Sequence, residues 1–350
     1  HQLSCVYFPS LSMAQLSERE FIDKLRFEKY DTEQAKAEES LYLMECIVGS
    51  AHWKTGSDLL NLLRNVGTSV QAKMPWETTP CNMVQRVIKI VIDEYNTLLG
   101  GNQGVEYPSL SQSMLVDPAC GDLPKCTEVI HELQDRVLEA IAEQKAEVEQ
   151  SQELIAGQGV SKIHNDEVIM TCGMCPLVLA FLTKAAKQRK FHVFVAECAP
   201  KYDGHPMAKA LCSAGIQTTL IQDSAVFPIM SRVNKVIIGT RTVVSNGGIK
   251  TFVGAASLAS AAKFYSVPLY VCTPTYKFSL MGCEEISHES STSIIPKGTK
   301  FPLSVNAALT KLDYVPPENV TSFITNNRGI APSYVYRQLS ELYHPASFDF

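Results

Sequence analysis

The segment VIMTCGMCPLVLAFLTKAAKQRKFHVFVA, residues 168–196, decides the fold. It contains an apolar, β-rich run at 168–171, a stretch with helical spacing of apolar residues at 177–188, and a second apolar run at 191–196. A strand, a helix and another strand in this order are typical of two parallel strands joined by a crossover helix. The segment therefore predicts an α/β domain.

The same alternation continues toward the C-terminus. Further β-rich runs lie at 218–221, 236–238 and 269–271, and helical stretches lie at 205–214 and 255–265. This pattern predicts a mostly parallel sheet covered by helices on both faces, a kind of sheet that binds ligands at the carboxyl ends of its strands. Beyond it we expect a return to helix, with one helix starting at Pro316-Pro317-Glu318 and another at 333–343.

Upstream of the deciding segment the sequence has the pattern of helices. Apolar residues recur at three-to-four spacing over 17–25, 32–48, 57–66 and 82–98. A longer helix is expected over 126–156, with its inner face formed by Ile130, Leu133, Val137, Ile141 and Val148. We therefore expect a helical domain over 17–157 and an α/β domain over 158–350. Residues 1–16 are expected to lie outside the fold, as a disordered or non-native extension.

Composition excludes several classes of protein. The eleven cysteines of the 350 residues show no pairing pattern, and no Cys/His cluster has zinc-ligand spacing, so we expect a reducing, cytosolic compartment and no metal. Cys172 and Cys175 form a CxxC, but it lies within an apolar strand-to-helix run. No run approaches the roughly 20 apolar residues of a membrane span, so we expect no association with a membrane.

Charge and glycine patterns argue against nucleic-acid and nucleotide binding. Residues 1–150 carry 13 Lys and Arg against 23 Asp and Glu, a net charge of −10, whereas residues 151–350 carry 18 against 13, a net charge of +5. The positive charges are dispersed, which is a poor match to RNA or DNA. No phosphate-binding loop of the G-x-x-x-x-G-K-[ST] or G-x-G-x-x-G type is present, so no cofactor is expected.

Three polar residues mark a candidate site at one edge of the predicted sheet. His164 and Asp166 precede the first β-rich run, and His192 lies in the second. Adjacent parallel strands could bring these side chains together. A purely structural histidine is the alternative for either His.

Several segments resemble the regulatory subunits of eukaryotic translation initiation factor 2B. They are ETTPCNMVQRVIKIVIDEY (77–95), KIHNDEVIMTCG (162–173), KFHVFVAECAP (190–200), GIQTTLIQDSAVFPIMSRVNKVIIGTRTVVSNGGI (215–249) and PSYVYRQLSELYHP (332–345). The strings RVNKVIIGT (232–240) and ELYHP (341–345) favour the beta branch over the alpha and delta branches.

The resemblance implies a helical domain followed by a Rossmann-like domain of the sugar-phosphate isomerase type. It also implies a non-catalytic, regulatory place in the guanine-nucleotide exchange factor for initiation factor 2. Such a subunit helps to bind that factor and to sense phosphorylation of its alpha subunit. The implied partners are the alpha, gamma, delta and epsilon subunits of factor 2B and factor 2 itself, especially its alpha subunit.

The isomerases of this fold supply the alternative function. Their nucleophilic Cys lies in a THC motif, which becomes Thr171-Cys172-Gly173 here, so Gly173 takes the nucleophile's place. Their acid-base Asp lies in a GAD motif, which becomes Gly239-Thr240-Arg241. Their phosphate-binding Arg before a Pro is replaced by Ala199. These substitutions predict no isomerase activity, although binding of a metabolite without turnover is left open.

Two surfaces are candidates for protein contacts. Arg136, Glu139 and Glu143 lie on the charged face of the long helix, which the resemblance makes a candidate docking face for the alpha subunit of factor 2; plain solvation is the alternative. Near the end of the chain, Tyr334, Tyr336, Leu339 and Tyr343 recur at helical spacing. We expect them to form an uncovered apolar patch that contacts another subunit.

Overall fold

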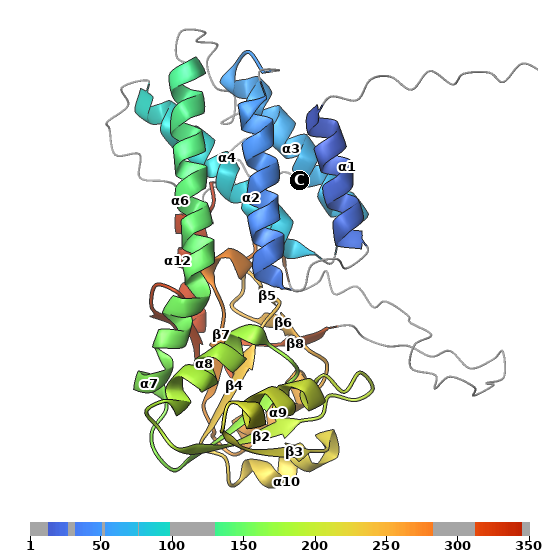
Figure 1. Cartoon of the computed structure of the whole chain (residues 1–350), viewed down its shortest axis with the longest axis vertical. Helices are drawn as coiled ribbons and strands as arrows, with labels where there is room; N and C mark the ends of the chain where they lie inside the picture. The colour runs from blue at the N-terminus through green and yellow to red at the C-terminus, as the bar shows by residue number, and fades with distance from the viewer. Residues whose placement is uncertain are drawn as a thin grey trace, which may run out of the picture. The chain divides into compact units, whose positions relative to one another are not determined.

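The computed structural model describes residues 13–26, 32–50, 53–75, 77–98, 130–282 and 312–344. The chain folds into two compact units (Figure 1). One unit contains the described residues up to Glu149 together with those from Ser340 onward, and the other is Gln150–Leu339. The division falls between Glu149 and Gln150, within a long helix that ends at Gly157, whereas the sequence predicts a domain boundary after residue 157.

The first unit is helical, as predicted. Its helices are α1 (Met13–Arg26), α2 (Glu33–Gly49), α3 (Gly56–Lys73), α4 (Thr78–Leu98) and the first part of α6 (Ile130–Gly157). Threonine side chains cap two of them: Thr32 accepts a hydrogen bond from the Ala35 N–H, and Thr55 accepts one from the Asp58 N–H. Such caps satisfy N–H groups that the first turn leaves free. Residues 1–12 and 126–129 lie outside the described part of the chain.

Two helices of this unit are longer than predicted. Helix α3 continues past Gly67, because the apolar spacing of Leu63, Val66 and Val70 carries its buried face onward. Helix α4 begins four residues early, with Pro80 in its first turn, where a missing N–H costs little. The predicted inner faces are confirmed in the described side chains: the buried ones are Met83, Val84, Val87, Ile88, Val91, Ile92, Leu133, Val137, Ile141 and Val148.

The second unit is built on a seven-stranded sheet of order β10-β9-β7-β4-β1-β2-β3. The strands are β1 (Glu167–Cys172), β2 (Phe191–Ala196), β3 (Gln217–Ile221), β4 (Lys235–Gly239), β7 (Leu269–Cys272), β9 (Ser322–Ile324) and β10 (Gly329–Ile330). All pairings are parallel except that of β9 with β10. The predicted, mostly parallel sheet is confirmed.

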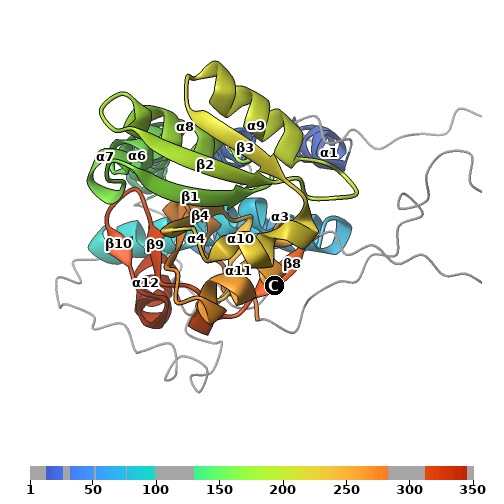
Figure 2. The same ribbon diagram turned by 90° about the horizontal axis from the view of Figure 1, so that it is seen from below.

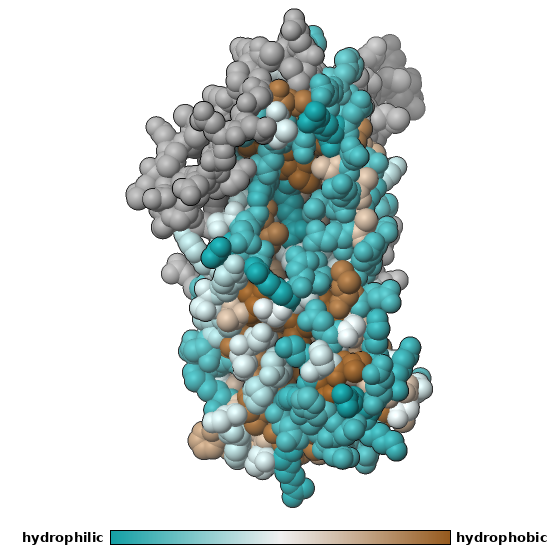
Figure 3. Space-filling model, turned by 90° about the vertical axis from the view of Figure 1, so that its left-hand side faces the viewer, coloured by the Kyte–Doolittle hydropathy of each residue, from teal (hydrophilic) through white to brown (hydrophobic). Residues whose placement is uncertain are grey.

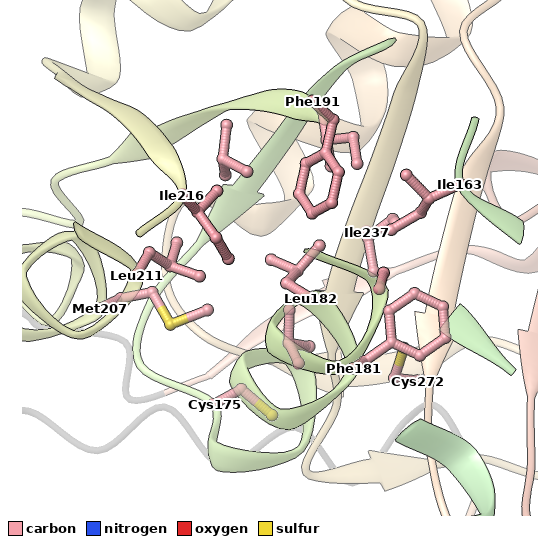
Figure 4. Close-up of a cluster of buried hydrophobic side chains, with 14 of the residues drawn as sticks. Ile163, Cys175, Phe181, Leu182, Phe191, Met207, Leu211, Ile216, Ile237 and Cys272 are labelled. Atoms are coloured by element: carbon pink, nitrogen blue, oxygen red, sulfur yellow. The ribbon is translucent and has the colours of Figure 1, made fainter. Parts of the chain in front are cut away.

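Helices cover both faces of this sheet (Figure 2). Helices α8 (Pro176–Ala186) and α9 (Gly204–Ser213) lie on one face, and α10 (Val226–Met230) and α11 (Ala255–Phe264) lie on the other. A cluster of buried side chains under α8 and α9 joins helices to strands, as Figure 4 shows for Phe181, Leu182, Met207 and Leu211. Parallel strands that are buried on both faces explain the continuous apolar runs in the sequence.

The prediction of a helix starting at Pro316-Pro317-Glu318 was wrong. The structure has a single 3-10 turn, Pro317–Asn319, followed by strand β9. Strand β9 pairs with β7 (Tyr270 opposite Ser322), so tertiary pairing overrides the local helix-start signal. The sequence also missed a small antiparallel sheet of β5 (Thr242–Val243), β6 (Ile249–Thr251) and β8 (Asp313–Val315). The last predicted helix is confirmed as α12 (Val335–Leu342).

Candidate functional site

The carboxyl end of β1 has a backbone shape that favours glycine. Gly173 follows β1 with a φ of +67°, and a Cβ placed there would lie 2.9 Å from Cγ of Phe252. A cysteine at this position would therefore be strained and would displace the phenyl ring. The sequence shows the glycine itself, but it does not show that the Phe252 ring lies against this position.

The neighbouring thiol, that of Cys172, is held in its protonated form. Cys172 is buried, and a hydrogen bond with Cys198, followed by burial, raises the pKa of the Cys172 thiol well above its ordinary value. Because the thiolate is the reactive form, the protonated thiol is a poor nucleophile.

Backbone amides in the loop after β2 bind the carboxylate of Asp223. The N–H groups of Cys198 and Ala199 donate hydrogen bonds to the two carboxylate oxygens of Asp223, at 2.9 and 2.7 Å. The sequence did not single out Asp223. Its carboxylate fixes the loop after β2, and Ala199 contributes its backbone amide to this contact.

At the end of β4 the structure gathers cationic residues. The backbone N–H of Arg241 donates to the Lys250 carbonyl at 3.0 Å, and the buried Lys277 ammonium donates to the Thr240 carbonyl at 2.8 Å. The Thr240 hydroxyl is hydrogen-bonded to backbone carbonyls. This strand end is therefore cationic.

A pocket of about 580 Å³ opens at the opposite end of the sheet, where β1, β2 and β3 begin. Its lining includes Asp166, Lys190, His192 and Gln217. The structure thus brings Asp166 and His192 to one pocket, since β1 and β2 pair with Val168 opposite His192. His164 does not line it; that residue is exposed, and its backbone N–H donates to Glu167.

Within this pocket His192 has a hydrogen-bonding partner on the next strand. Its Nε2 lies 2.9 Å from the hydroxyl oxygen of Thr219. Asp166 is exposed and has a φ of +61°, a conformation that Asp and Asn tolerate better than most residues. These polar groups lie at the amino ends of the strands, whereas parallel sheets generally bind ligands at the carboxyl ends.

The charged face of α6 is partly paired within the chain. Arg136 forms an ion pair with Glu132 at 2.8 Å and a longer one of 4.0 Å with Glu94 on α4. Glu139 and Glu143 are exposed. The Glu94 contact joins residues 42 positions apart, so the sequence pattern did not reveal it. The face presents exposed carboxylates beside a paired guanidinium.

The expected patch near the end of the chain is smaller than predicted. Leu339 and Tyr343 are buried within the chain, so they do not add to an exposed surface. Tyr334 is half-buried beneath the Arg328 guanidinium, 4.9 Å from its ring centre, and Tyr336 is 40% exposed. The helical spacing was right, but α12 turns much of its apolar face inward.

Membrane spans and metal sites are both absent from the described residues. None of their helices is long and apolar enough to cross a membrane. Within the same part of the chain, no group of three or more His, Cys, Asp or Glu side chains could hold a metal ion.

Known proteins are similar to this chain in sequence and in architecture. Residues 29–333 match the initiation factor 2 subunit family. The chain belongs to this family. Two relatives of this family member are "translation initiation factor eIF2B subunit beta" of Schizosaccharomyces pombe, 31% identical over 92% of this chain and 94% of that protein, and its namesake of Dictyostelium discoideum, 33% identical over 90% of each.

Two solved structures and one enzyme are also similar to this chain. A chain of the tetrameric eIF2B-beta2-delta2 complex from Chaetomium thermophilum has the same fold (TM-score 0.73, 24% identity, 96% of this chain and 100% of that chain). So does eIF2B delta from that organism (TM-score 0.62, 16% identity, 89% and 97%). Ribose 1,5-bisphosphate isomerase of Archaeoglobus fulgidus is 30% identical over 55% of this chain and 63% of the enzyme.

Proposed function

We propose that this chain is a beta-type regulatory subunit of the cytosolic guanine-nucleotide exchange factor for translation initiation factor 2. The observation that carries the proposal is similarity to two eIF2B beta subunits over nine-tenths or more of both chains. Similarity of this extent covers the helical unit as well as the α/β unit, whereas the isomerase relative covers little more than half of the chain.

The second candidate, a sugar-phosphate isomerase, is disfavoured by the carboxyl end of the sheet. Gly173 holds the nucleophile's place in a backbone conformation suited to glycine, and the adjacent Cys172 is buried and protonated. Arg241 stands where the general acid-base carboxylate is required, and Ala199 where the phosphate-binding Arg is required. Isomerisation needs a proton acceptor near the reacting carbons. We propose that the chain carries out no chemistry of its own.

In this function the chain is a binding and positioning part. We propose that it assembles with alpha, gamma, delta and epsilon subunits, and that the α6 face with Arg136, Glu139 and Glu143 contacts the alpha subunit of factor 2. The pocket with Asp166 and His192 is proposed to face a neighbouring subunit, with His164 beside it. Exposed charges of both signs suit a contact that forms and dissociates during each exchange cycle.

One experiment separates the two functions. The tagged chain would be purified with its associated proteins, and every partner would be identified by mass spectrometry. The purified complex would then be assayed for GDP release from factor 2 and for isomerisation of ribose 1,5-bisphosphate and methylthioribose 1-phosphate. We expect exchange-factor subunits and GDP release without sugar-phosphate turnover. Turnover by the chain, or purification without any exchange-factor subunit, would contradict the proposal.

A further inference from the structure

Helices α10 and α11 lie side by side on one face of the sheet (Figure 2) and border a hollow of about 530 Å³. Phe227 of α10 and Phe264 of α11 line this hollow, and their rings are 48% and 70% exposed. By contrast, the face drawn in Figure 3 is mainly hydrophilic, with hydrophobic residues in small separate patches. Sites for small ligands usually measure about 300–1,000 Å³, so the hollow has room for one.

The two phenyl rings leave their faces open to a ligand. Their centres lie 5.2 Å apart and their planes are inclined by 46°, so the rings are not stacked face to face. Tyr265 packs against both rings, with its ring centre 5.3 Å from that of Phe227 and 5.1 Å from that of Phe264. The face of such a ring attracts a cation that lies within about 6 Å of its centre. One cation can therefore contact both rings at once.

The rest of the lining also favours a positive charge. Among the described residues that line the hollow, Asp223 carries the only charge, and there is no Lys or Arg. The Asp223 carboxylate accepts two backbone N–H groups, but its two oxygens offer about four lone-pair sites. Ser224, Ser257 and Ser260 add hydroxyl groups to the lining. The Ser260 hydroxyl donates to the Ala256 carbonyl at 2.8 Å, which leaves its oxygen as an acceptor.

The apolar part of the lining distinguishes between kinds of cation. Val226, Ala256 and Ala261 join the two rings, so much of the wall is carbon. A metal ion or a primary ammonium group is strongly hydrated and would lose that hydration against carbon. In the described part of the chain, no group of three or more His, Cys, Asp or Glu could replace it around a metal. An N-methylated ammonium group is weakly hydrated, and aromatic faces recognise it.

We infer that the α10–α11 hollow is a binding site for an N-methylated ammonium group. The Phe227 and Phe264 rings contact its methyl groups, and Asp223 supplies the opposite charge. This inference is independent of the proposed function. Free quaternary ammonium compounds such as choline and trimethylated lysine side chains of proteins both carry this group, and both present the same chemistry to the hollow.

Two probes of the same shape test the site in the unmodified full chain, purified with its associated proteins. Choline carries a trimethylammonium group, and its isostere 3,3-dimethyl-1-butanol has an uncharged carbon in place of the nitrogen. Saturation-transfer NMR would detect contact with the protein, and titration would give the two dissociation constants. We expect choline to bind about tenfold more tightly, because only the cation is attracted by the rings and the carboxylate. Equal affinities, or no saturation transfer to choline, would overturn the inference.

A single substitution tests whether this binding occurs in the hollow. Phe264→Leu keeps an apolar side chain but removes a ring face, and the 70% exposure of Phe264 makes a loss of folding unlikely to follow from it. Choline affinity should fall about threefold to tenfold, and affinity for the uncharged isostere should change less than about twofold. Tyr202→Leu is the matched control, because Tyr202 is 49% exposed in the same unit but does not line the hollow. Equal choline affinity in the two variants would overturn the assigned site.

Peptides identify the source of the methylated group. A short peptide with one trimethyllysine would be compared with choline, and the tighter binder, by about tenfold or more, would assign the site to a modified protein or to a free metabolite. The same peptide with unmodified lysine should bind about tenfold more weakly than its trimethylated form. Equal binding of the two peptides would overturn the requirement for methylation.

Discussion

The two ends of the parallel sheet differ in what they offer to a ligand or partner. At the carboxyl end, Phe252 packs where a side chain at Gly173 would lie, and backbone amides use the Asp223 carboxylate. At the amino end, Asp166 and His192 line an open pocket. At the first end the Asp223 carboxylate is bound by backbone amides, whereas at the second end Asp166 is exposed and His192 is hydrogen-bonded to Thr219 within an open pocket.

This difference supports the proposed role in binding rather than in catalysis. Catalysis requires side chains that are accessible and poised to exchange protons, and a buried, protonated thiol such as Cys172 meets neither condition. Rigid packing at one end of the sheet still helps to fix the strands, and thereby the polar groups at the other end. Substitutions at the two ends, and then in the helical unit, test this difference.

The largest effect is expected at Gly173. Gly173→Cys would place a second thiol at the end of β1, but the new residue must adopt a positive φ and displace Phe252. We expect a loss of about 2–4 kcal/mol in the free energy of unfolding, with no isomerase activity. Chemical denaturation would measure it. Gly215→Ala is the control, because Gly215 also has a positive φ (+79°) but no atom within 4 Å of its added Cβ. That variant should lose only about 1 kcal/mol. Equal losses at both positions would show that the carboxyl end is not tightly packed.

A smaller effect is expected at Asp223. Asp223→Ala removes the acceptor of the Cys198 and Ala199 N–H groups, so we expect a loss of about 1–3 kcal/mol in the free energy of unfolding. Asp203→Ala serves as the control, because the Asp203 side chain makes no capping hydrogen bond at the start of α9. Denaturation of both variants would compare them. If Asp223→Ala were as stable as the control, the carboxylate would be free for another role.

At the amino end the expected effect on stability is smaller still. His192→Ala loses one hydrogen bond to Thr219 at the surface, so the free energy of unfolding should fall by less than about 1 kcal/mol. Subunit assembly or the response to small molecules that bind the assembly should nevertheless change. Thr219→Val removes the same hydrogen bond and keeps the imidazole. Altered assembly in His192→Ala but not in Thr219→Val would assign the effect to the ring, and no change in either would leave His192 as a structural residue.

The smallest effects on stability belong to the exposed face of α6. Arg136→Glu with Glu143→Lys should slow GDP release by the whole complex in a salt-dependent way, with assembly unchanged. The structure adds one refinement: Arg136→Glu places a third carboxylate near Glu132 and Glu94, and should cost about 0.5 kcal/mol. Glu143→Lys alone should cost nothing measurable. GDP release at the normal rate across a salt series would show that this face is merely solvated. Loss of assembly would show that it is a subunit interface.

Much of the fold could be predicted because its signals are local. The apolar runs of β1 and β2 and the three-to-four apolar spacing in α4 and α6 arise because whole faces of these elements are buried. Each of these patterns is visible within its own segment of the sequence. The short strand β9 shows no such pattern. Only three residues long and preceded by two prolines, it becomes a strand through its pairing with β7.

The candidate sites divide in the same way. From the residues alone came the absence of phosphate-binding loops, the glycine at 173 and the arginine at 241, and the alternation of strands and helices from β1 to β7. Only the tertiary structure decided that Tyr343 is buried, that Glu94 pairs with Arg136, and that Phe227 meets Phe264 in the open. The physical reason is one of range. Backbone propensity and amphipathic spacing act over a few residues, whereas exposure and ion pairing depend on which distant segments are brought together.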